Sequence, residues 1–279
     1  MRTATLLSSL CLLATLPMSS RAADLCEHSA ARNLDLDLTG VKTLVFDIGP
    51  HELSVAGGKA RTAAIRGKAC ASDAKRLDDL VLSQRREGDK LIVVAERKGA
   101  VRSVSWSGAK YGYLTLDATL PDTIAVQVKL GSGDASVDGV ASLAADVGSG
   151  DLEADHIRGT VFADVGSGDI VVHDVGALHV VSVGSGDLSA RVVRGDATVG
   201  SVNSGDLRID NAGGRVRIES IGSGDAELSG VAGNVSVDSI GSGNLEVTDV
   251  RGDLVVNSVG SGSVGHHGVA GQVRVPTDD

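Results

Sequence analysis

The sequence predicts an all-β protein whose C-terminal half is a single-stranded parallel β-helix, a solenoid of about eight coils of 17–19 residues, preceded by an irregular β-rich N-terminal cap. Three observations support this fold class: a glycine-rich tetrad that recurs, short runs of alternating apolar and polar residues, and a composition with 37 glycines but only 2% aromatic residues. A core of Val, Leu, Ile and Ala with so few large rings suits a narrow rod better than a globular core.

The tetrad Gly-Ser-Gly-Asp, or a close variant, recurs through residues 130–275, the predicted solenoid. Its eight copies begin at Gly131, Gly148, Gly166, Gly184, Asn203, Gly222, Gly241 and Gly260. A fixed period of this length is typical of solenoids, in which each unit buries its apolar face against its neighbours. Stacked coils would place equivalent residues about 4.8 Å apart, and right-handed winding is the rule for parallel crossovers.

Each unit contains two short predicted strands. In residues 151–155, Leu152 and Ala154 alternate with acidic residues, and residues 161–165 alternate again after a turn. Period-two alternation between glycines indicates strands, and no run shows a helical period. The turn glycines are expected either to adopt a positive φ or to allow close approach of neighbouring backbone.

The final coil departs from the pattern. His266 takes the inward place of Val247 in the coil before it, and Pro276 stops the strand ahead of the polar tail, residues 276–279. Because a terminal unit needs a polar end and a blocked edge, His266 and His267 are expected to cap the solenoid. A two-histidine metal site is the alternative, although the sequence offers no evident third ligand.

Residues 23–129 are β-rich but irregular. Strands are predicted over residues 41–47, 91–95 and 113–117, whereas the polar residues 72–90 are expected to form a short helix or a loop. No Pro/Ser-rich linker separates this segment from the repeats. It is therefore expected to cap the solenoid and contribute its first turns in one continuous body.

Residues 1–22 are predicted to be a secretory signal peptide. An apolar run over residues 6–16 is followed by a small-x-small cleavage site at residues 20–22. The run is too short to span a bilayer, and no later segment is long enough to do so. Cys11 and Cys26 each follow a leucine, whereas lipidation needs a small residue there. The sequence thus predicts a periplasmic or secreted protein that is not a lipoprotein.

Two cysteines, Cys26 and Cys70, follow the predicted signal peptide. An even pair in an oxidising compartment is expected to form a disulfide, with two free buried thiols as the alternative.

The charge is uneven, because 22 acidic but only nine basic residues lie from Lys129 onward. Nucleic acid is excluded as a partner, since binding it needs a basic surface.

An aspartate follows the glycines in most of the tetrads. These candidate site residues are Asp134, Asp151, Asp169, Asp187, Asp206 and Asp225, continued by Asn244 and Ser263. Two carboxylates at this spacing repel by about 1 kcal/mol in water, so the stack needs a compensating interaction. One hypothesis is that each side chain accepts a hydrogen bond from the backbone of its own turn. The other is calcium binding, as in the Gly/Asp-rich turns of calcium β-rolls.

Most of the aromatic residues gather in one short segment. Trp106, Tyr111 and Tyr113 lie beside Arg102 and Lys110. They are expected either to plug the open end of the solenoid or to contact a sugar or a protein partner.

No catalytic residue is predicted. The tetrad serines have no recurring histidine, so they are expected to form turn hydrogen bonds rather than act as nucleophiles. The GxGxxG at residues 260–265 precedes no helix and does not indicate dinucleotide binding. The Arg-Gly-Asp tripeptides at residues 194–196 and 251–253 are expected to be solvated turns.

Three segments together resemble a known family. They are residues 114–121 (Leu-Thr-Leu-Asp-Ala-Thr-Leu-Pro), residues 124–128 (Ile-Ala-Val-Gln-Val) and the serial Gly-Ser-Gly-Asp coils. They are similar to a bacterial family of exported proteins of unknown function that are named putative adhesins, and the likeness covers roughly residues 41–275. The resemblance implies a β-solenoid and no established reaction.

These observations predict a non-catalytic exported scaffold or binding protein of the cell envelope. It is expected to be a monomer without a cofactor and to bind an unknown envelope protein or glycan. A calcium-dependent surface adhesin is the first alternative. A polysaccharide-acting β-helix enzyme is the least favoured, because its site would need clustered carboxylates in a groove rather than one residue repeated uniformly.

Overall fold

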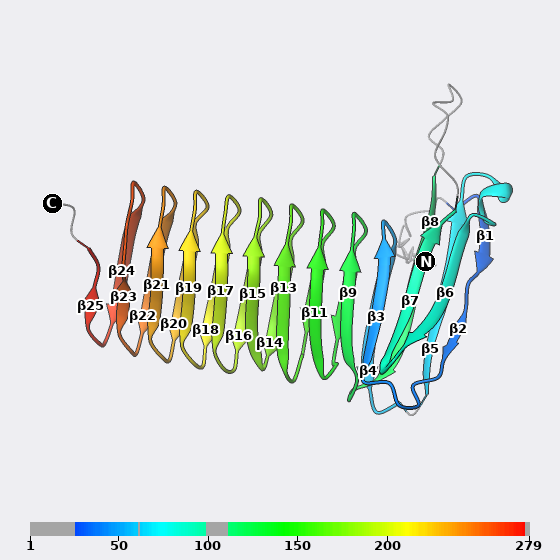
Figure 1. The fold of residues 1–279 in the computed structure, drawn as a ribbon, viewed down its shortest axis with the longest axis horizontal. Coiled ribbons are helices and arrows are strands. Elements are labelled where there is room, and N and C mark those ends of the chain that lie inside the picture. Colours follow the sequence, from blue (N-terminus) through cyan, green and yellow to red (C-terminus); the bar gives the residue numbers. More distant parts are fainter. Residues whose placement is uncertain (1–25, 61, 99–110, 277–279) are drawn as a thin grey trace, which may run out of the picture.

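The computed structural model describes residues 26–60, 62–98 and 111–276. The chain forms a long rod in which the strands lie side by side across the rod axis (Figure 1). In the described chain these strands make two sheets, sheet A with 13 strands and sheet B with 12. Each repeat crosses once from sheet B to sheet A, which confirms the predicted parallel solenoid.

The repeat strands pair in parallel with their equivalents in the coils before and after them. In sheet A they are β10 (Ala135–Asp138), β12 (Leu152–Asp155), β14 (Ile170–Val175), β16 (Leu188–Val193), β18 (Leu207–Ala212), β20 (Ala226–Val231), β22 (Asn244–Val250) and β24 (Ser263–Val269). In sheet B they are β9 (Ala125–Leu130), β11 (Ser142–Val147), β13 (Thr160–Val165), β15 (Ala177–Val183), β17 (Ala197–Val202), β19 (Val216–Ile221), β21 (Val235–Ile240), β23 (Leu254–Val256) and β25 (Val273–Arg274).

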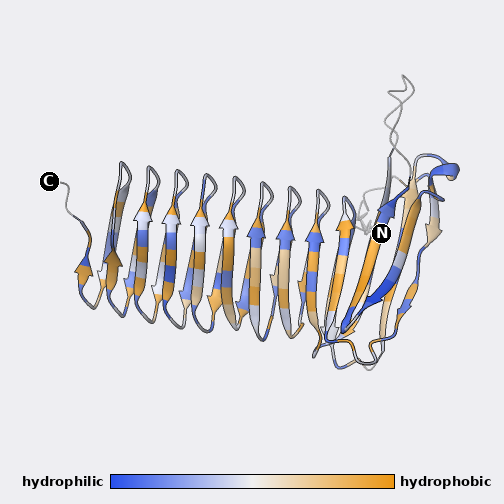
Figure 2. Ribbon diagram, in the orientation of Figure 1, coloured by the Kyte–Doolittle hydropathy of each residue, from blue (hydrophilic) through white to orange (hydrophobic). Residues whose placement is uncertain are grey.

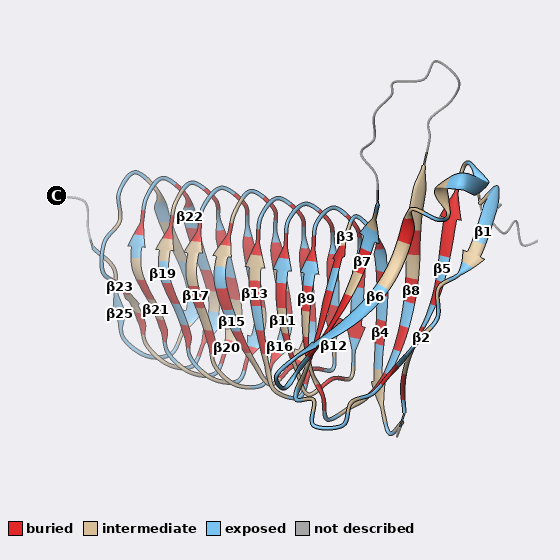
Figure 3. Cartoon of the chain, turned by 45° about the vertical axis from the view of Figure 1, so that its right-hand side comes forward, coloured by how far each residue is buried: buried red, intermediate tan, exposed pale blue. Residues whose placement is uncertain are grey.

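The core consists of aliphatic columns that run along the rod. Leu152 pairs with Ile170, Ile170 with Leu188, and Leu188 with Leu207, and all four side chains are buried. Polar and apolar positions alternate along the strands (Figure 2), and the buried positions recur from strand to strand (Figure 3). Because each coil covers the apolar face of the next, a core with few aromatic residues still excludes water.

The tetrad glycines allow close backbone approach, which was one of the two roles expected of them. None of them has a positive φ. A Cβ atom at Gly150 would lie 1.7 Å from the carbonyl oxygen of Gly133, and one at Gly168 would lie 1.8 Å from that of Gly150. Any side chain at the second glycine would therefore collide with the coil before it.

Each repeat strand of sheet A has one residue with a positive φ near or just after its C-terminal end. These residues are Gly139, His156, Asp174, Val192, Asn211, Gly230, Asp249 and Gly268. Val192, with φ at +59°, differs from the others because it is β-branched, and β-branched residues are disfavoured in this conformation.

The remaining elements precede the repeats. They are β1 (His28–Ala31), β2 (Leu34–Leu36), β3 (Thr43–Gly49), β4 (Glu52–Gly58), β5 (Ala63–Ala71), the 3-10 helix η1 (Ala74–Arg76), β6 (Leu80–Glu87), β7 (Lys90–Arg97) and β8 (Gly112–Pro121). The three strands predicted here correspond to β3, β7 and β8. Residues 72–90 were predicted wrongly in part, because the antiparallel pairing of β6 with β7 makes Leu80–Glu87 a strand.

The coil formed by β3 and β4 is stacked out of sequence order. β3 pairs with β7 on one side and β9 on the other, and β4 lies between β8 and β10 (Figure 1). After Gly58 the chain builds β5 to β8 at the N-terminal end and then returns past β3 to start β9. Residues far apart in the sequence therefore become neighbours at this end of the solenoid.

The N-terminal end is closed by antiparallel strands. β5 pairs with β8 and carries β1 and β2 along its other edge. The predicted disulfide is confirmed, with Cys26 bonded to Cys70 at a Cα–Cα distance of 5.4 Å, and it ties the start of β1 to β5. The part of the chain that the structure describes contains no helix long and apolar enough to cross a membrane.

Candidate functional site

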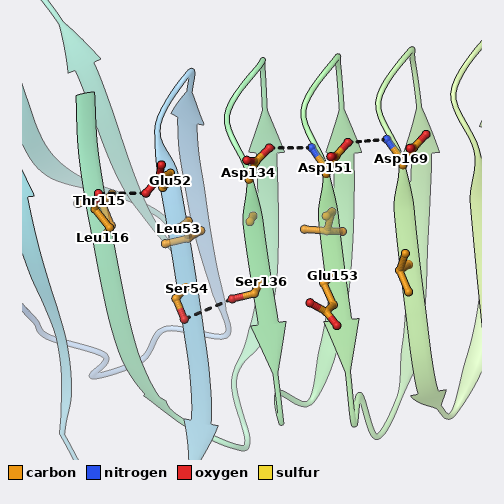
Figure 4. Close-up of a pocket in the computed structure, with 13 residues that line it drawn as sticks. Glu52, Leu53, Ser54, Thr115, Leu116, Asp134, Ser136, Asp151, Glu153 and Asp169 are labelled. Atoms are coloured by element: carbon orange, nitrogen blue, oxygen red, sulfur yellow. Dashed lines mark hydrogen bonds between the residues drawn. The ribbon is translucent and has the colours of Figure 1, made fainter. Parts of the chain in front are cut away.

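Each aspartate of the tetrad ladder caps the backbone of the next coil. The Oδ1 atom of Asp134 accepts a hydrogen bond of 3.2 Å from the N–H of Asp151, and Oδ1 of Asp151 accepts one of 3.2 Å from the N–H of Asp169 (Figure 4). The same bond joins Asp169 to Asp187, Asp187 to Asp206, Asp206 to Asp225 and Asp225 to Asn244, at 2.8–3.0 Å. The predicted bond to the backbone of the same turn is therefore wrong, because the donor belongs to the following coil.

The backbone N–H donors of this ladder offset part of the repulsion between stacked carboxylates. Within the described residues, none of the six aspartates forms a salt bridge. A charged acceptor makes a stronger hydrogen bond to a backbone N–H than a neutral one does. The ladder thus stabilises the stack and leaves a row of negative charge along one edge of sheet A.

A groove of about 660 Å³ lies on the outer face of sheet A, where β8, β4, β10, β12 and β14 run side by side (Figure 4). Its floor is low because the outward residues on β4 and β10 are small. These are Ser54 and Ser136, whose hydroxyl oxygens lie 3.3 Å apart in a hydrogen bond. On the following strands the same column holds the larger Glu153 and Val171.

Five acidic side chains line this groove. They are Glu52, Asp134, Asp151, Glu153 and Asp169. Glu52 accepts a hydrogen bond of 3.1 Å from the hydroxyl of Thr115, and no salt bridge within the described residues reaches any of the five. The groove therefore combines a partly apolar floor with five carboxylates that form no salt bridge among the described residues.

The surrounding coils do not neutralise this charge. Residues 130–190 contain ten acidic residues and a single basic one, Arg158, which pairs with Asp122. Seven basic residues follow residue 190, and most of them form salt bridges with acidic residues between residues 174 and 238. Such pairs are Arg194 with Asp174, Arg208 with Asp210, Arg215 with Asp196, and Arg217 with Asp238. The coils on the C-terminal side of the groove therefore supply little positive charge near it.

The groove continues toward the N-terminal end. An adjoining hollow of about 550 Å³ shares Glu52 and Thr115 with it and is also lined by Arg66, Lys68 and Tyr113. The structure thus brings one of the predicted aromatic contact residues, Tyr113, to the same face as the start of the aspartate ladder. Its ring centroid lies 6.3 Å from that of Tyr111. Trp106 lies outside the described residues.

Glu52 and Ser54 were not predicted as site residues. Residues 49–52 (Gly-Pro-His-Glu) take the place of a tetrad. Glu52 lies beside Asp134, and His51 lies against Gly133. The signal is hidden, because the motif has changed and the neighbouring coil begins only at Gly131. An acidic residue three positions after Gly49 is the one remaining trace of the repeat.

His51 is fully buried at this junction. Its Nδ1 atom accepts a hydrogen bond of 3.2 Å from the backbone N–H of Leu114, and its Nε2 atom has no hydrogen-bond partner among the described residues. Burial, with a smaller contribution from the positive charge of Arg97, lowers the pKa of His51 to about 4. The ring is therefore neutral at physiological pH and serves the packing between coils.

The other sequence motifs have structural roles. The first Arg-Gly-Asp tripeptide is not simply solvated as predicted, because Arg194 pairs with Asp174 and Oδ1 of Asp196 accepts a hydrogen bond of 2.9 Å from the N–H of Arg215.

His266 lies beside Val247 in the inward column, yet it is exposed at the end of the stack. Among the described residues, no three or more His, Cys, Asp or Glu side chains gather as metal ligands.

The fold and this surface define the class of the protein, a two-sheet parallel β-solenoid with an acidic groove beside its N-terminal cap. A putative adhesin from Parabacteroides merdae aligns over 86% of this chain and 97% of its own, with a TM-score of 0.52 and 15% sequence identity. A putative lipid binding protein from Parabacteroides distasonis aligns over the same shares, with a TM-score of 0.55 and 16% identity.

These solved structures confirm the resemblance to putative adhesins at the level of the fold, and at such identities they bear on the fold alone. No protein-family model matches the chain, and no curated protein matches it.

Proposed function

We propose that this protein is a non-catalytic, exported binding scaffold of the cell envelope. Its ligand surface is the acidic groove on sheet A, and its partner is a cationic, extended segment of another envelope protein. Export is supported by the signal-like residues 1–22 and by the Cys26–Cys70 disulfide, a bond typical of oxidising compartments.

One observation carries the choice of surface: five acidic side chains, which have no salt bridge within the part of the chain that the structure describes, line a preformed groove with a partly apolar floor. A Lys- or Arg-rich segment complements it in two ways, since the long side chains place alkyl stems on apolar surface and charged ends beside carboxylates. The ladder keeps the groove rigid, because one oxygen of each aspartate is fixed by the next coil. A rigid site loses little entropy on binding.

A matched pair of variants tests this proposal. The groove variant carries Asp151→Asn, Glu153→Gln and Asp169→Asn. The distal variant carries Asp206→Asn, Asp225→Asn and Glu246→Gln, the same three chemical changes at equivalent places in later coils. Asparagine keeps the Oδ1 acceptor of the ladder, so both variants are expected to fold and to have the same net charge.

Binding of an octa-arginine peptide to the mature chain is measured by calorimetry at 150 mM salt. The groove variant is expected to weaken binding at least tenfold, and the distal variant by less than threefold. Equal weakening by the two variants would show that binding follows net charge rather than the groove. Absence of binding to the unmodified chain would reject the cationic partner.

A further inference from the structure

The outer face of sheet B carries a second surface feature, remote from the acidic groove. Phe162 on β13 is 48% exposed and Val181 on β15 is 54% exposed. Phe162 is one of only two phenylalanines in the chain. Burial of an aromatic ring stabilises a fold, so an exposed ring on a strand requires an explanation.

Val181 follows the buried Val180 on β15 and faces outward at a β-bulge. The pairing of β13 with β15 shifts by one residue between Ala163 and Val165, so β15 holds an extra residue there. Ser182 donates a hydrogen bond of 2.6 Å to Asp164 across the bulge. In the later coils the place of Val181 is taken by Gly200 and Glu219, so the apolar side chain is confined to this coil.

Polar side chains continue the row that starts at Phe162. The ring of His179 meets that of Phe162 edge to face, with centroids 5.3 Å apart, and its Nδ1 atom lies 2.6 Å from the hydroxyl oxygen of Thr198. Arg217 follows in the same column on the next strand. Here the surface is hollowed by about 450 Å³, in part because Gly200 has no side chain.

Glu219 lies on the same side of this hollow as Gly200 and forms no salt bridge within the described residues. Arg217 pairs with Asp238 and still lines the hollow. The site thus offers an exposed ring, a carboxylate, a guanidinium and an imidazole within successive coils.

We propose that this surface is a saccharide-binding site. A pyranose ring has an apolar C–H face and a rim of hydroxyl groups, which matches an exposed aromatic ring beside hydrogen-bonding side chains. The C–H face would lie on Phe162 and Val181, and the hydroxyls would bond to His179, Arg217 and Glu219. A protein partner fits less well, since a standard interface buries about 800 Å² on each side around an apolar centre, and this patch has only two exposed apolar side chains.

The test uses four soluble tetrasaccharides as probes: chitotetraose, cellotetraose, maltotetraose and mannotetraose. Their binding to the mature chain is followed by saturation-transfer NMR and quantified by calorimetry. At least one is expected to bind with a millimolar or lower Kd. Phe162→Ala is expected to weaken that binding at least tenfold, and Glu219→Gln at least threefold.

The matched control is Val273→Ala, which trims an exposed apolar residue at the C-terminal end of sheet B, away from the hollow. It is expected to leave saccharide binding unchanged. Thermal melts report folding, and Phe162→Ala is expected to unfold cooperatively with only a small drop in melting temperature because its ring is half exposed. If no probe binds at millimolar concentrations, or if Phe162→Ala and Val273→Ala bind a probe equally well, the proposal is overturned. Neither outcome bears on the acidic groove, which lies on the other sheet.

Discussion

Oδ1 of Asp169 accepts a hydrogen bond of 2.9 Å from the backbone N–H of Asp187, the residue in the same place one coil later. The acceptor and the donor thus belong to different coils. Repetition of this bond along the rod converts a column of like charges into a set of links between neighbouring units.

The first prediction concerns this link. Replacing Asp187 by alanine is expected to lower the free energy of unfolding by about 1–2 kcal/mol, because the N–H of Asp206 loses its charged acceptor. Asp187→Asn should be close to neutral, since the amide oxygen can accept the same bond while one repulsive charge is removed. Chemical denaturation measures both. Equal destabilisation by the two variants would show that the charge, rather than the acceptor, is what matters.

Calcium removal gives a second prediction. Because backbone donors already compensate the ladder, the melting temperature of the mature chain is expected to be the same in excess chelator and in millimolar calcium. Differential scanning calorimetry checks this. A drop of many degrees in chelator would instead support the calcium-dependent adhesin hypothesis.

A third prediction concerns the second glycine of the tetrad. Gly186→Ala is expected to destabilise the chain by at least about 3 kcal/mol, because the new Cβ would lie 1.8 Å from the carbonyl oxygen of Gly168. Gly58→Ala is the control, since a Cβ there meets nothing within 4 Å. The two unfolding midpoints compare them directly. Similar stability of both variants would mean that the coils are not in close contact at the tetrad.

The left-handed position of Val192 gives a fourth prediction. Replacing it by asparagine, which occupies the equivalent place at Asn211, is expected to raise the free energy of unfolding by about 1 kcal/mol. Val171→Asn serves as the control, because Val171 is exposed on a strand without a positive φ and should lose stability. If Val192→Asn does not gain stability relative to the unmodified chain, the assigned backbone conformation is contradicted.

A fifth prediction concerns pH. Protons bind the His51 ring less readily in the folded chain, with its pKa near 4, than in the unfolded chain, with the ordinary value of 6.5. Stability is therefore lost as pH falls from about 6.5 toward 4, by up to about 3 kcal/mol. His156 behaves oppositely, because its hydrogen bond to Asp138 raises its pKa.

Imidazole NMR resonances separate these two histidines. The His51 signal should stay in its neutral position down to pH 5, while the His156 signal titrates above its ordinary midpoint. Titration of His51 near pH 6.5 would show that its ring is accessible to water in the folded chain.

The repeat coils could be predicted from the sequence because the same residue types recur at the same positions of each unit. Gly150 must fit under the carbonyl of Gly133, and Leu152 must face inward over Ile170. The direction of the aspartate hydrogen bonds could not be predicted, since both the own-turn and the next-coil donors suit an Asp after a glycine. Which donor lies within hydrogen-bond distance depends on the spacing and offset between neighbouring coils.

The groove could not be predicted for a related reason. Ser54 and Ser136 become neighbours only because the β3–β4 coil is inserted between β8 and β10. Nothing local in residues 49–58 fixes that long-range arrangement, and the altered tetrad around His51 conceals it. The exposed ring of Phe162 was overlooked because it fits the alternating strand pattern on the polar face.

The most direct test is cross-linking at the inserted coil, since the groove exists only if that coil lies between β8 and β10. Ser54 is paired with Ser136 on one side and with Asp117 on the other. The Ser54→Cys/Ser136→Cys chain is predicted to form the new disulfide on mild oxidation, as mapped by non-reducing mass spectrometry, while Asp117→Cys/Ser136→Cys is predicted to form none. If the coils were stacked in sequence order, β8 would lie beside β10. A 117–136 link without a 54–136 link would then be found and would contradict the account.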